Sequence, residues 1–233
     1  QPIGTVRNDA APPPTEGDGG FTTPNSATPA PSNDGPCVGS RFDSVEQALK
    51  QCEVPMPKSG EMPSGLHDKL DIQVSTNPSQ AKPGGHLEVV VLFRNKTADP
   101  LSLYFTGDPT PRFDVEAVDA KGKRVDLPAG KPPKAPPSPG REAKASRLTL
   151  SPAGTARVVL SWDAVKTKWA PEKMKTWEGR GFPRASAGPL PAGKYTLRVV
   201  LPLLGLFEKG DADLPRVAMA GRPLLEPVEQ QLA

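Results

Sequence analysis

Residues 86–95 read HLEVVVLFRN, and this stretch decides the fold. Every second residue from Leu87 to Phe93 is a large apolar side chain, which is the side-chain period of a β-strand. Val90 and Leu92 lie between them, so the centre of the strand is apolar on both faces. Strands of this kind are typical of the middle of a sheet. The stretch therefore predicts a central strand of a β-domain.

The same two-residue period recurs on both sides of this stretch. It is present in LDIQVS from residue 70, in LSLYF from residue 101 and in KYTLRVVL from residue 194. FDVEAVDAKGKRVDL, from residue 113, predicts a hairpin, and RLTLSPAGTARVVLSW, from residue 147, predicts two short strands around Pro152-Ala153-Gly154. The side chains expected to face the core are Leu70, Ile72, Val74, Leu101, Leu103, Phe105, Phe113, Val115, Ala117, Val125, Leu127, Val158, Leu160, Trp162, Tyr195, Leu197, Val199 and Leu201.

Seven to nine short strands separated by turn residues predict two packed sheets, and no helix-length period follows residue 55. Weaker strands are expected near 216–219 and 224–228. Tyr195, at the start of a late strand after Gly193, occupies a position similar to the tyrosine corner of immunoglobulin-like domains. The predicted fold class is all-β, an immunoglobulin-like antiparallel β-sandwich.

Two further segments precede the sandwich, which is expected over residues 67–233. Residues 1–36 are rich in Pro, Gly, Ser and Thr, so they cannot bury enough apolar surface to offset chain entropy and predict a disordered tether. Residues 37–66 predict a small helix with a linker. The helix is expected over 43–52, with Asp43 or Ser44 as its N-cap and a Pro-rich, irregular stretch after it.

The chain has two cysteines, Cys37 and Cys52, which lie 15 residues apart. We expect them to form one disulfide at the end of this helix. The alternative is a pair of unpaired thiols in a cytosolic protein. Neither cysteine has an evident relation to a histidine, so a catalytic cysteine is not expected.

Composition narrows the class of protein. The net charge is only +3, which does not favour a nucleic-acid partner, and no apolar run is long enough to span a membrane. A polar, Pro-rich spacer at the start of the chain is typical of a surface-tethered bacterial protein. We expect an extracytoplasmic protein of the periplasm or cell surface, either lipid-anchored at its N-terminus or freely secreted, and monomeric.

Several of these segments together resemble the intracellular proteinase inhibitor family of the BsuPI type, over roughly residues 70–201. In that family an apolar strand with an Asn turn precedes an aspartate-containing hairpin, and Pro-Gly turns precede a Trp strand and a Tyr strand. The matching positions are Asn95, Phe113, Asp114, Val118, Asp119, Gly122, Leu150, Pro152, Gly154, Trp162, Pro191, Gly193 and Tyr195. The resemblance implies an immunoglobulin-like fold and, as an alternative function, proteinase inhibition. The chain departs from the family at Val125-Asp126-Leu127, where an aromatic residue is usual.

No enzyme motif occurs in the chain, so we expect a protein that binds rather than catalyses, without a cofactor. Met56, Met62 and His67 are soft-metal ligand types, but their spacing matches no fixed pattern and no metal site is expected.

The connection over residues 163–184 is the strongest candidate for a binding segment. It is longer than most strand connections, and Trp and Arg are enriched at binding hot spots. A short helical turn is possible at PEKMKTWE. The predicted partner-binding residues are Trp169, Lys173, Lys175, Trp177, Arg180, Phe182 and Arg184.

Three interpretations of this connection stay open. The tryptophans cap one end of the sandwich, or they bind a partner, or they stack on a cation or a carbohydrate. A second basic loop over 128–146 would extend the surface if it emerges at the same end. The expected partner is an envelope protein or an anionic polymer, with a protease as the alternative and a purely structural envelope role not excluded.

Overall fold

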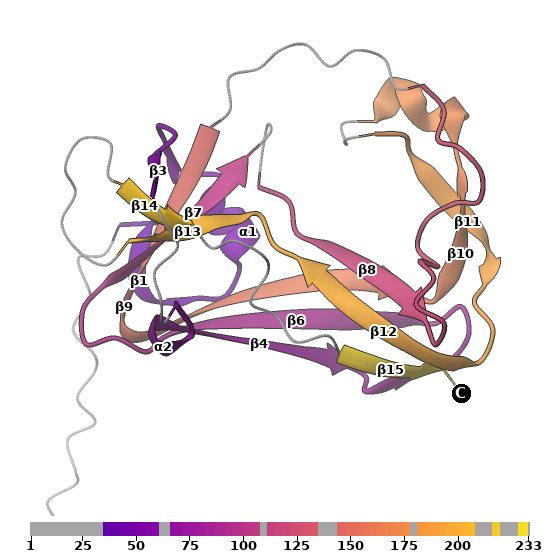
Figure 1. Ribbon diagram of the computed structural model, residues 1–233, viewed down its shortest axis with the longest axis horizontal. Coiled ribbons are helices and arrows are strands. Elements are labelled where there is room, and N and C mark those ends of the chain that lie inside the picture. The colour runs from indigo at the N-terminus through magenta and orange to yellow at the C-terminus, as the bar shows by residue number, and fades with distance from the viewer. Residues whose placement is uncertain are drawn as a thin grey trace, which may run out of the picture. The chain divides into compact units, whose positions relative to one another are not determined.

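The computed structural model describes residues 35–60, 66–107, 111–134, 144–177, 181–207, 216–219 and 228–232. Within them the chain forms three sheets (Figure 1). The largest has the strand order β3-β14-β13-β7-β9-β6-β4, with β1 and β2 also paired to β9. A second sheet has the order β5-β15-β12-β8, and a third consists of β10 and β11.

The elements have the following bounds. The first half of the chain contains β1 (Val38–Phe42), α1 (Val45–Leu49), β2 (Glu53–Val54), β3 (Lys58–Gly60), α2 (Leu66–Lys69), β4 (Leu70–Asn77), β5 (Gln80–Ala81), β6 (His86–Asn95), β7 (Leu101–Gly107) and β8 (Asp114–Asp119). The second half contains β9 (Lys144–Asp163), β10 (Val165–Trp169), the 3-10 helix η1 (Pro171–Thr176), β11 (Arg184–Pro189), β12 (Gly193–Val200), β13 (Leu203–Phe207), β14 (Arg216–Met219) and β15 (Val228–Leu232).

The two larger sheets share one apolar core, which confirms the all-β sandwich. Leu87, Val89, Val91 and Phe93 of β6 are fully buried, as their alternation predicts. They belong to the same core cluster as the buried side chains of β8 and β12 in the facing sheet. Pairings are mostly antiparallel, but β1–β9, β14–β3 and β15–β5 are parallel.

The stretch around Pro152 differs from its prediction. The structure has one strand, β9, rather than two strands joined by a turn. Its first part pairs with β7 and its second part with β6, both antiparallel. Between the two parts the chain bends near Ala153, which has a φ of 57°. A Cβ on Gly154 would lie 2.7 Å from the carbonyl oxygen of Ser151, so only glycine fits without a shift.

Buried Asn95 holds this bend from the side of β6. Its side-chain amide donates to the carbonyl oxygens of Leu150 and Ser151, each at 3.1 Å, and to that of Asp99 at 2.9 Å. Its side-chain oxygen accepts from the backbone N–H of Thr97 at 2.8 Å. The carbonyls of Leu150 and Ser151 next to the bend are therefore paired with a buried side-chain amide.

The predicted helix and disulfide are present, although α1 is shorter than expected. Ser44 is the N-cap, and its hydroxyl accepts from the backbone N–H of Gln47 at 3.4 Å. Val45 and Leu49 are buried in the sandwich core. Cys37 and Cys52 form the disulfide. The Pro-rich stretch from residue 55 was expected to be irregular, but β3 lies there because β14 supplies a backbone partner, and β2 pairs with β9 just before it.

Two other strand predictions need correction. The return of the hairpin after β8 is reduced to a bridge between Val118 and Arg124, and Leu127 is 41% exposed instead of buried. In the tail, β14 has the predicted bounds, whereas the last strand, β15, begins at Val228 and pairs with β12 and β5.

The tyrosine corner is confirmed. The hydroxyl of Tyr195, at the start of β12, donates to the carbonyl oxygen of Pro191 at 2.8 Å. Burial, with a smaller contribution from the charge of Asp119, raises the pKa of Tyr195 above its usual value of 10.0.

Among the described segments, no helix is both long and apolar enough to cross a membrane. The predicted tether falls almost entirely outside them, since only Gly35 and Pro36 of that segment are described.

Candidate binding site

The connection between β9 and β12 is a β-hairpin rather than a long loop. β10 pairs antiparallel with β11, from Val165 opposite Pro189 to Trp169 opposite Arg184. The backbone N–H of Ala170 donates to the carbonyl of Pro183 at 2.8 Å beyond the last pair. The 3-10 helix η1 follows, beginning at Pro171, and contains the helical turn predicted there.

Buried Ala164 holds the base of this hairpin. Its N–H donates to the carbonyl of Gly85, and its own carbonyl accepts from Gly84, both at 2.9 Å. The same carbonyl accepts from the N–H of Leu190 at 2.8 Å, at the other end of the hairpin. Both ends of the hairpin are therefore hydrogen-bonded at one buried position next to β6.

The predicted partner-binding residues divide into three groups on this hairpin. Lys173 and Lys175 on η1 are exposed, and Trp177 just after it is 41% exposed. Trp169 and Phe182 are half-buried, and within the described part of the chain the buried indole Nε1 of Trp169 has no hydrogen-bond partner.

The third group consists of the two predicted arginines. Arg184 lies at the start of β11 and contacts Asp126 rather than standing free: its guanidinium donates to the backbone carbonyl of Asp126 at 3.1 Å. Arg180 lies outside the described residues.

The second predicted loop is described only in part. Lys131 and Lys134 are exposed, whereas Lys144 begins β9 and pairs with Glu53 on β2 at 2.8 Å. Residues 135–143 lie outside the described ranges.

Asp126 connects the hairpin to β8, and its role has no signal in the sequence. Its carboxylate accepts from the Nε of Arg124 at 2.6 Å and from the backbone N–H of Ala117 at 3.2 Å. Its backbone carbonyl accepts from the hydroxyl of Thr167 on β10 at 2.9 Å, in addition to Arg184. Only 11% of the Asp126 side chain is exposed. One residue thus joins the edge of β8 to both strands of the hairpin.

The arginine beside Asp126 is held in its charged form. Hydrogen bonding to Asp126 raises the pKa of Arg124 against the opposing effect of burial, and the charge of Glu116 adds to this.

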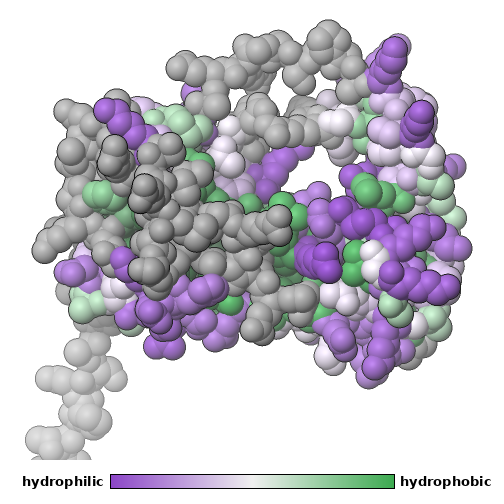
Figure 2. Space-filling model, viewed as in Figure 1, coloured by the Kyte–Doolittle hydropathy of each residue, from purple (hydrophilic) through white to green (hydrophobic). Residues whose placement is uncertain are grey.

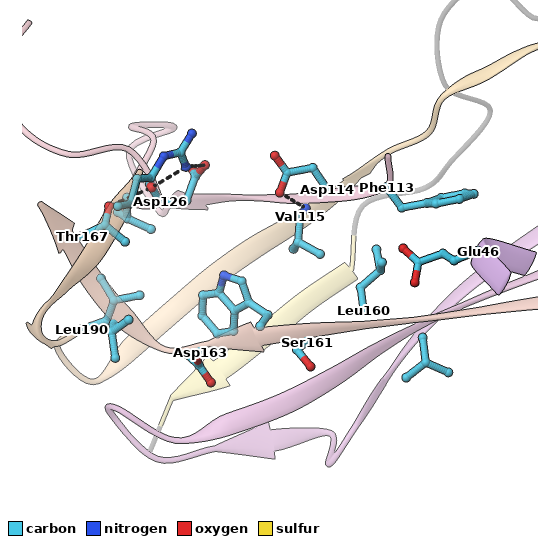
Figure 3. Close-up of a pocket in the computed structure, with 15 residues that line it drawn as sticks. Glu46, Phe113, Asp114, Val115, Asp126, Leu160, Ser161, Asp163, Thr167 and Leu190 are labelled. Atoms are coloured by element: carbon cyan, nitrogen blue, oxygen red, sulfur yellow. Dashed lines mark hydrogen bonds and ion pairs between the residues drawn. The ribbon is translucent and has the colours of Figure 1, made fainter. Parts of the chain in front are cut away.

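A cleft of about 500 Å³ lies between β8 and the second half of β9 (Figure 3). Val165 and Thr167 of the hairpin line one end, and Glu46 of α1 lines the other. Phe113, Val115 and Leu160 supply apolar wall, together with Trp162 and Leu190. On the right-hand part of the face in Figure 2, the described residues are mostly hydrophilic, with a few hydrophobic ones among them.

Successive residues of β9 line the cleft in different ways. Figure 3 shows Leu160 directed toward β8, whereas the side chains of Ser161 and Asp163 are directed away from the cleft. Both of these residues nevertheless line it. They therefore line it with their backbone, and β9 presents a strand edge there. The side chain of Asp163 instead meets His86 at 2.8 Å.

No protein-family model matches the chain, and no curated protein matches its sequence. The resemblance to the BsuPI-type inhibitors, and the inhibition that it implies, therefore stay predictions that rest on the quoted residues.

Proposed function

We propose that the protein is a non-enzymatic binding module of a bacterial envelope. It holds its partner through the tip of the β10–β11 hairpin, which we define as Lys173, Lys175 and Trp177. The observation that carries this proposal is the exposure of Trp177 beside Lys173 and Lys175. An exposed indole next to exposed lysines that have no ion pair among the described residues suits an acidic protein surface or an anionic polymer.

The way the hairpin is held supports this proposal. Its base is hydrogen-bonded at Ala164, and its side is bonded to Asp126 through Thr167 and Arg184. A tip held in this way loses little conformational freedom when a partner binds, so more of the contact energy appears as affinity.

An extracytoplasmic location is part of the proposal. The disulfide between Cys37 and Cys52 supports it, because disulfides persist mainly in oxidising compartments. We propose that the N-terminal spacer connects the module to the envelope through a lipid; the alternative is a freely secreted protein without an anchor. Mass spectrometry of the native N-terminus distinguishes the two.

The test uses Trp177→Ala and the charge-reversed pair Lys173→Glu/Lys175→Glu in the full chain. The exposed positions predict that both variants fold with unchanged thermal stability. Each variant should lose capture of an envelope protein by cross-linking, or lose binding to polyglutamate as the anionic-polymer probe. Trp169→Ala is unsuitable as the main test, because the half-buried ring contributes to packing.

A matched control reverses two exposed lysines elsewhere, Lys50→Glu/Lys121→Glu, which changes the net charge equally. If this control loses as much binding as the hairpin variants do, the protein attracts the anionic probe through its overall charge. The proposal would then fail. A panel of serine proteinases, assayed with micromolar protein, tests the inhibitor alternative in the same preparations.

A further inference from the structure

The second half of β9 has a partner on only one edge. Over residues 157–163, β6 is the only strand paired with β9 among the described residues. The register with β6 runs without a shift from Thr155 to Asp163. An unpaired strand edge offers a row of N–H and C=O groups to an additional strand.

The hydrogen bonds of Ala164 show which backbone groups face the cleft. Ala164 exchanges bonds with Gly84 and Gly85, on the side where β6 lies. In an antiparallel pair, successive residues direct their backbone groups to opposite edges. The N–H and C=O groups of Val159, Ser161 and Asp163 therefore lie on the cleft edge, in agreement with the lining of the cleft.

The opposite wall, β8, is already satisfied along most of its outer edge. The N–H of Ala117 is bonded to the carboxylate of Asp126, and its carbonyl accepts from Val125 at 2.9 Å. The N–H of Val115 is bonded to the carboxylate of Asp114 at 2.8 Å. The described residues give the edge of β9 over 157–163 no such cover, so a strand that enters the cleft would pair with β9 rather than with β8.

The charges of the residues that line the cleft determine which kind of added strand it could bind. Glu46, Asp114 and Asp126 are the acidic residues at the rim of the cleft, and Arg184 is the cation among the lining residues. Arg124 and Arg184 neutralise Asp126, whereas Glu46 and Asp114 have no ion pair within the described part of the chain. Figure 3 places Glu46 at the end of the cleft away from Thr167, and Asp114 on β8 between the two.

We propose that the cleft binds an extended, lysine- or arginine-bearing segment of another polypeptide, which adds as a strand to residues 157–163 of β9. Apolar side chains of the segment would contact Leu160, Trp162 and Val115, and a basic side chain would meet Glu46 and Asp114. A volume of about 500 Å³ is within the usual range of binding cavities. This site is separate from the hairpin tip and goes beyond the function proposed above.

The test measures fluorescence anisotropy of a labelled octapeptide of alternating valine and lysine with the full chain. Glu46→Gln/Asp114→Asn removes both unpaired charges and keeps their hydrogen-bonding oxygens, so affinity should fall at least about tenfold. Ser161→Pro removes an N–H on the cleft edge while leaving the pairing with β6, and should cause a similar loss. Ser161→Ala is its matched control and should bind like the wild type.

Two further arms keep the proposal falsifiable if Ser161→Pro does not fold. The same peptide N-methylated at alternate residues cannot add as a strand, and a valine–glutamate peptide has the opposite charge, so neither should bind. Asp68→Asn/Asp71→Asn, which removes two carboxylates near β4, should bind normally. Trp177→Ala should also bind normally, which separates this site from the hairpin tip.

Three results would overturn the proposal. The first is no saturable binding of the valine–lysine peptide up to about 1 mM. The second is equal binding of the N-methylated or charge-reversed peptide. The third is a concentration-dependent dimer in sedimentation that Ser161→Pro abolishes, since this would assign the edge of β9 to a second copy of the chain.

Discussion

The hydroxyl of Thr167 donates a hydrogen bond to the backbone carbonyl of Asp126 over 2.9 Å, which connects β10 to the segment after β8. The two residues are 41 positions apart in the chain. The side of the hairpin is held to the sandwich through this bond and the neighbouring bonds of Arg184. Both proposed binding surfaces depend on this hydrogen bond. The hairpin carries the first surface at its tip, and it lines one end of the cleft beside β9, which is the second.

Thr167→Val should therefore loosen the hairpin locally. The substitution keeps the shape of the side chain and removes one hydrogen bond, which contributes about 1 kcal/mol. Amide exchange within 165–169 should become about fivefold faster, while exchange in β6 stays unchanged. Thr176→Val, in η1, is the control because its hydroxyl bonds only within the same turn. Unchanged exchange in β10 would show that the bond to Asp126 does not hold the hairpin.

The bend in β9 predicts opposite effects at neighbouring positions. Gly154→Ala places a Cβ against the carbonyl oxygen of Ser151 and should destabilise the protein by about 1–3 kcal/mol. Ala153→Gly relieves a left-handed backbone position that costs alanine about 1 kcal/mol, which roughly offsets the greater chain entropy of glycine. Urea unfolding should therefore show a clear loss for the first variant and none for the second. Equal urea midpoints for the two variants would mean that a Cβ at position 154 does not strain the bend.

Tyr195 should make the protein less stable in alkali. Its folded pKa is raised above the unfolded value of 10.0, so the stabilisation is fully present below pH 10 and is lost as pH rises through the folded pKa. The phenolate also cannot donate to Pro191. Stability measured from pH 9 upward should fall more steeply for Tyr104→Phe than for Tyr104→Phe/Tyr195→Phe, in which no tyrosine titrates. Parallel pH profiles of the two variants would show that the pKa of Tyr195 is not raised in the folded protein.

Loss of the disulfide should weaken the region around α1. The carbonyls of Cys37 and Cys52 accept from the N–H groups of Thr149 and Arg147 on β9, so the bridge closes a loop against that strand. Closing a loop of this length contributes about 3 kcal/mol in the chain-entropy model. Cys37→Ser/Cys52→Ser should lose about this much stability in urea unfolding. Its amide exchange should increase first in β1 and α1, with the β10–β11 hairpin unaffected.

Local signals in the sequence predicted the core and several turns correctly. The alternation of β6 requires no partner to be recognised, because the period of two follows from strand geometry alone. The helix cap at Ser44 and the corner at Tyr195 are also local, since each bonds within four residues. Trp162 was likewise expected in the core and is buried. Which of the predicted partner-binding residues act in binding stays a prediction.

The hairpin and the bend could not be predicted in this way. VKTKW in β10 alternates half-buried and exposed residues, but over only five residues and with a threonine on the half-buried face, so its strand period is a weak signal. Pro152 and Gly154 are residues typical of a turn, yet the chain continues as one strand because Asn95, more than 50 residues away, pairs the carbonyls of the bend. In both places a distant backbone or side chain overrides the local preference.

The amino-acid sequence by itself determined most of the buried side chains of the core, that the protein is a β-sandwich, and which cysteines pair. These properties follow from side-chain period, turn residues and loop length, which are all local. Only the tertiary structure decided that Asp126 joins β8 to the hairpin and that, within the described segments, no strand pairs with the cleft edge of β9. Both depend on contacts between residues far apart in the chain, which no local pattern encodes.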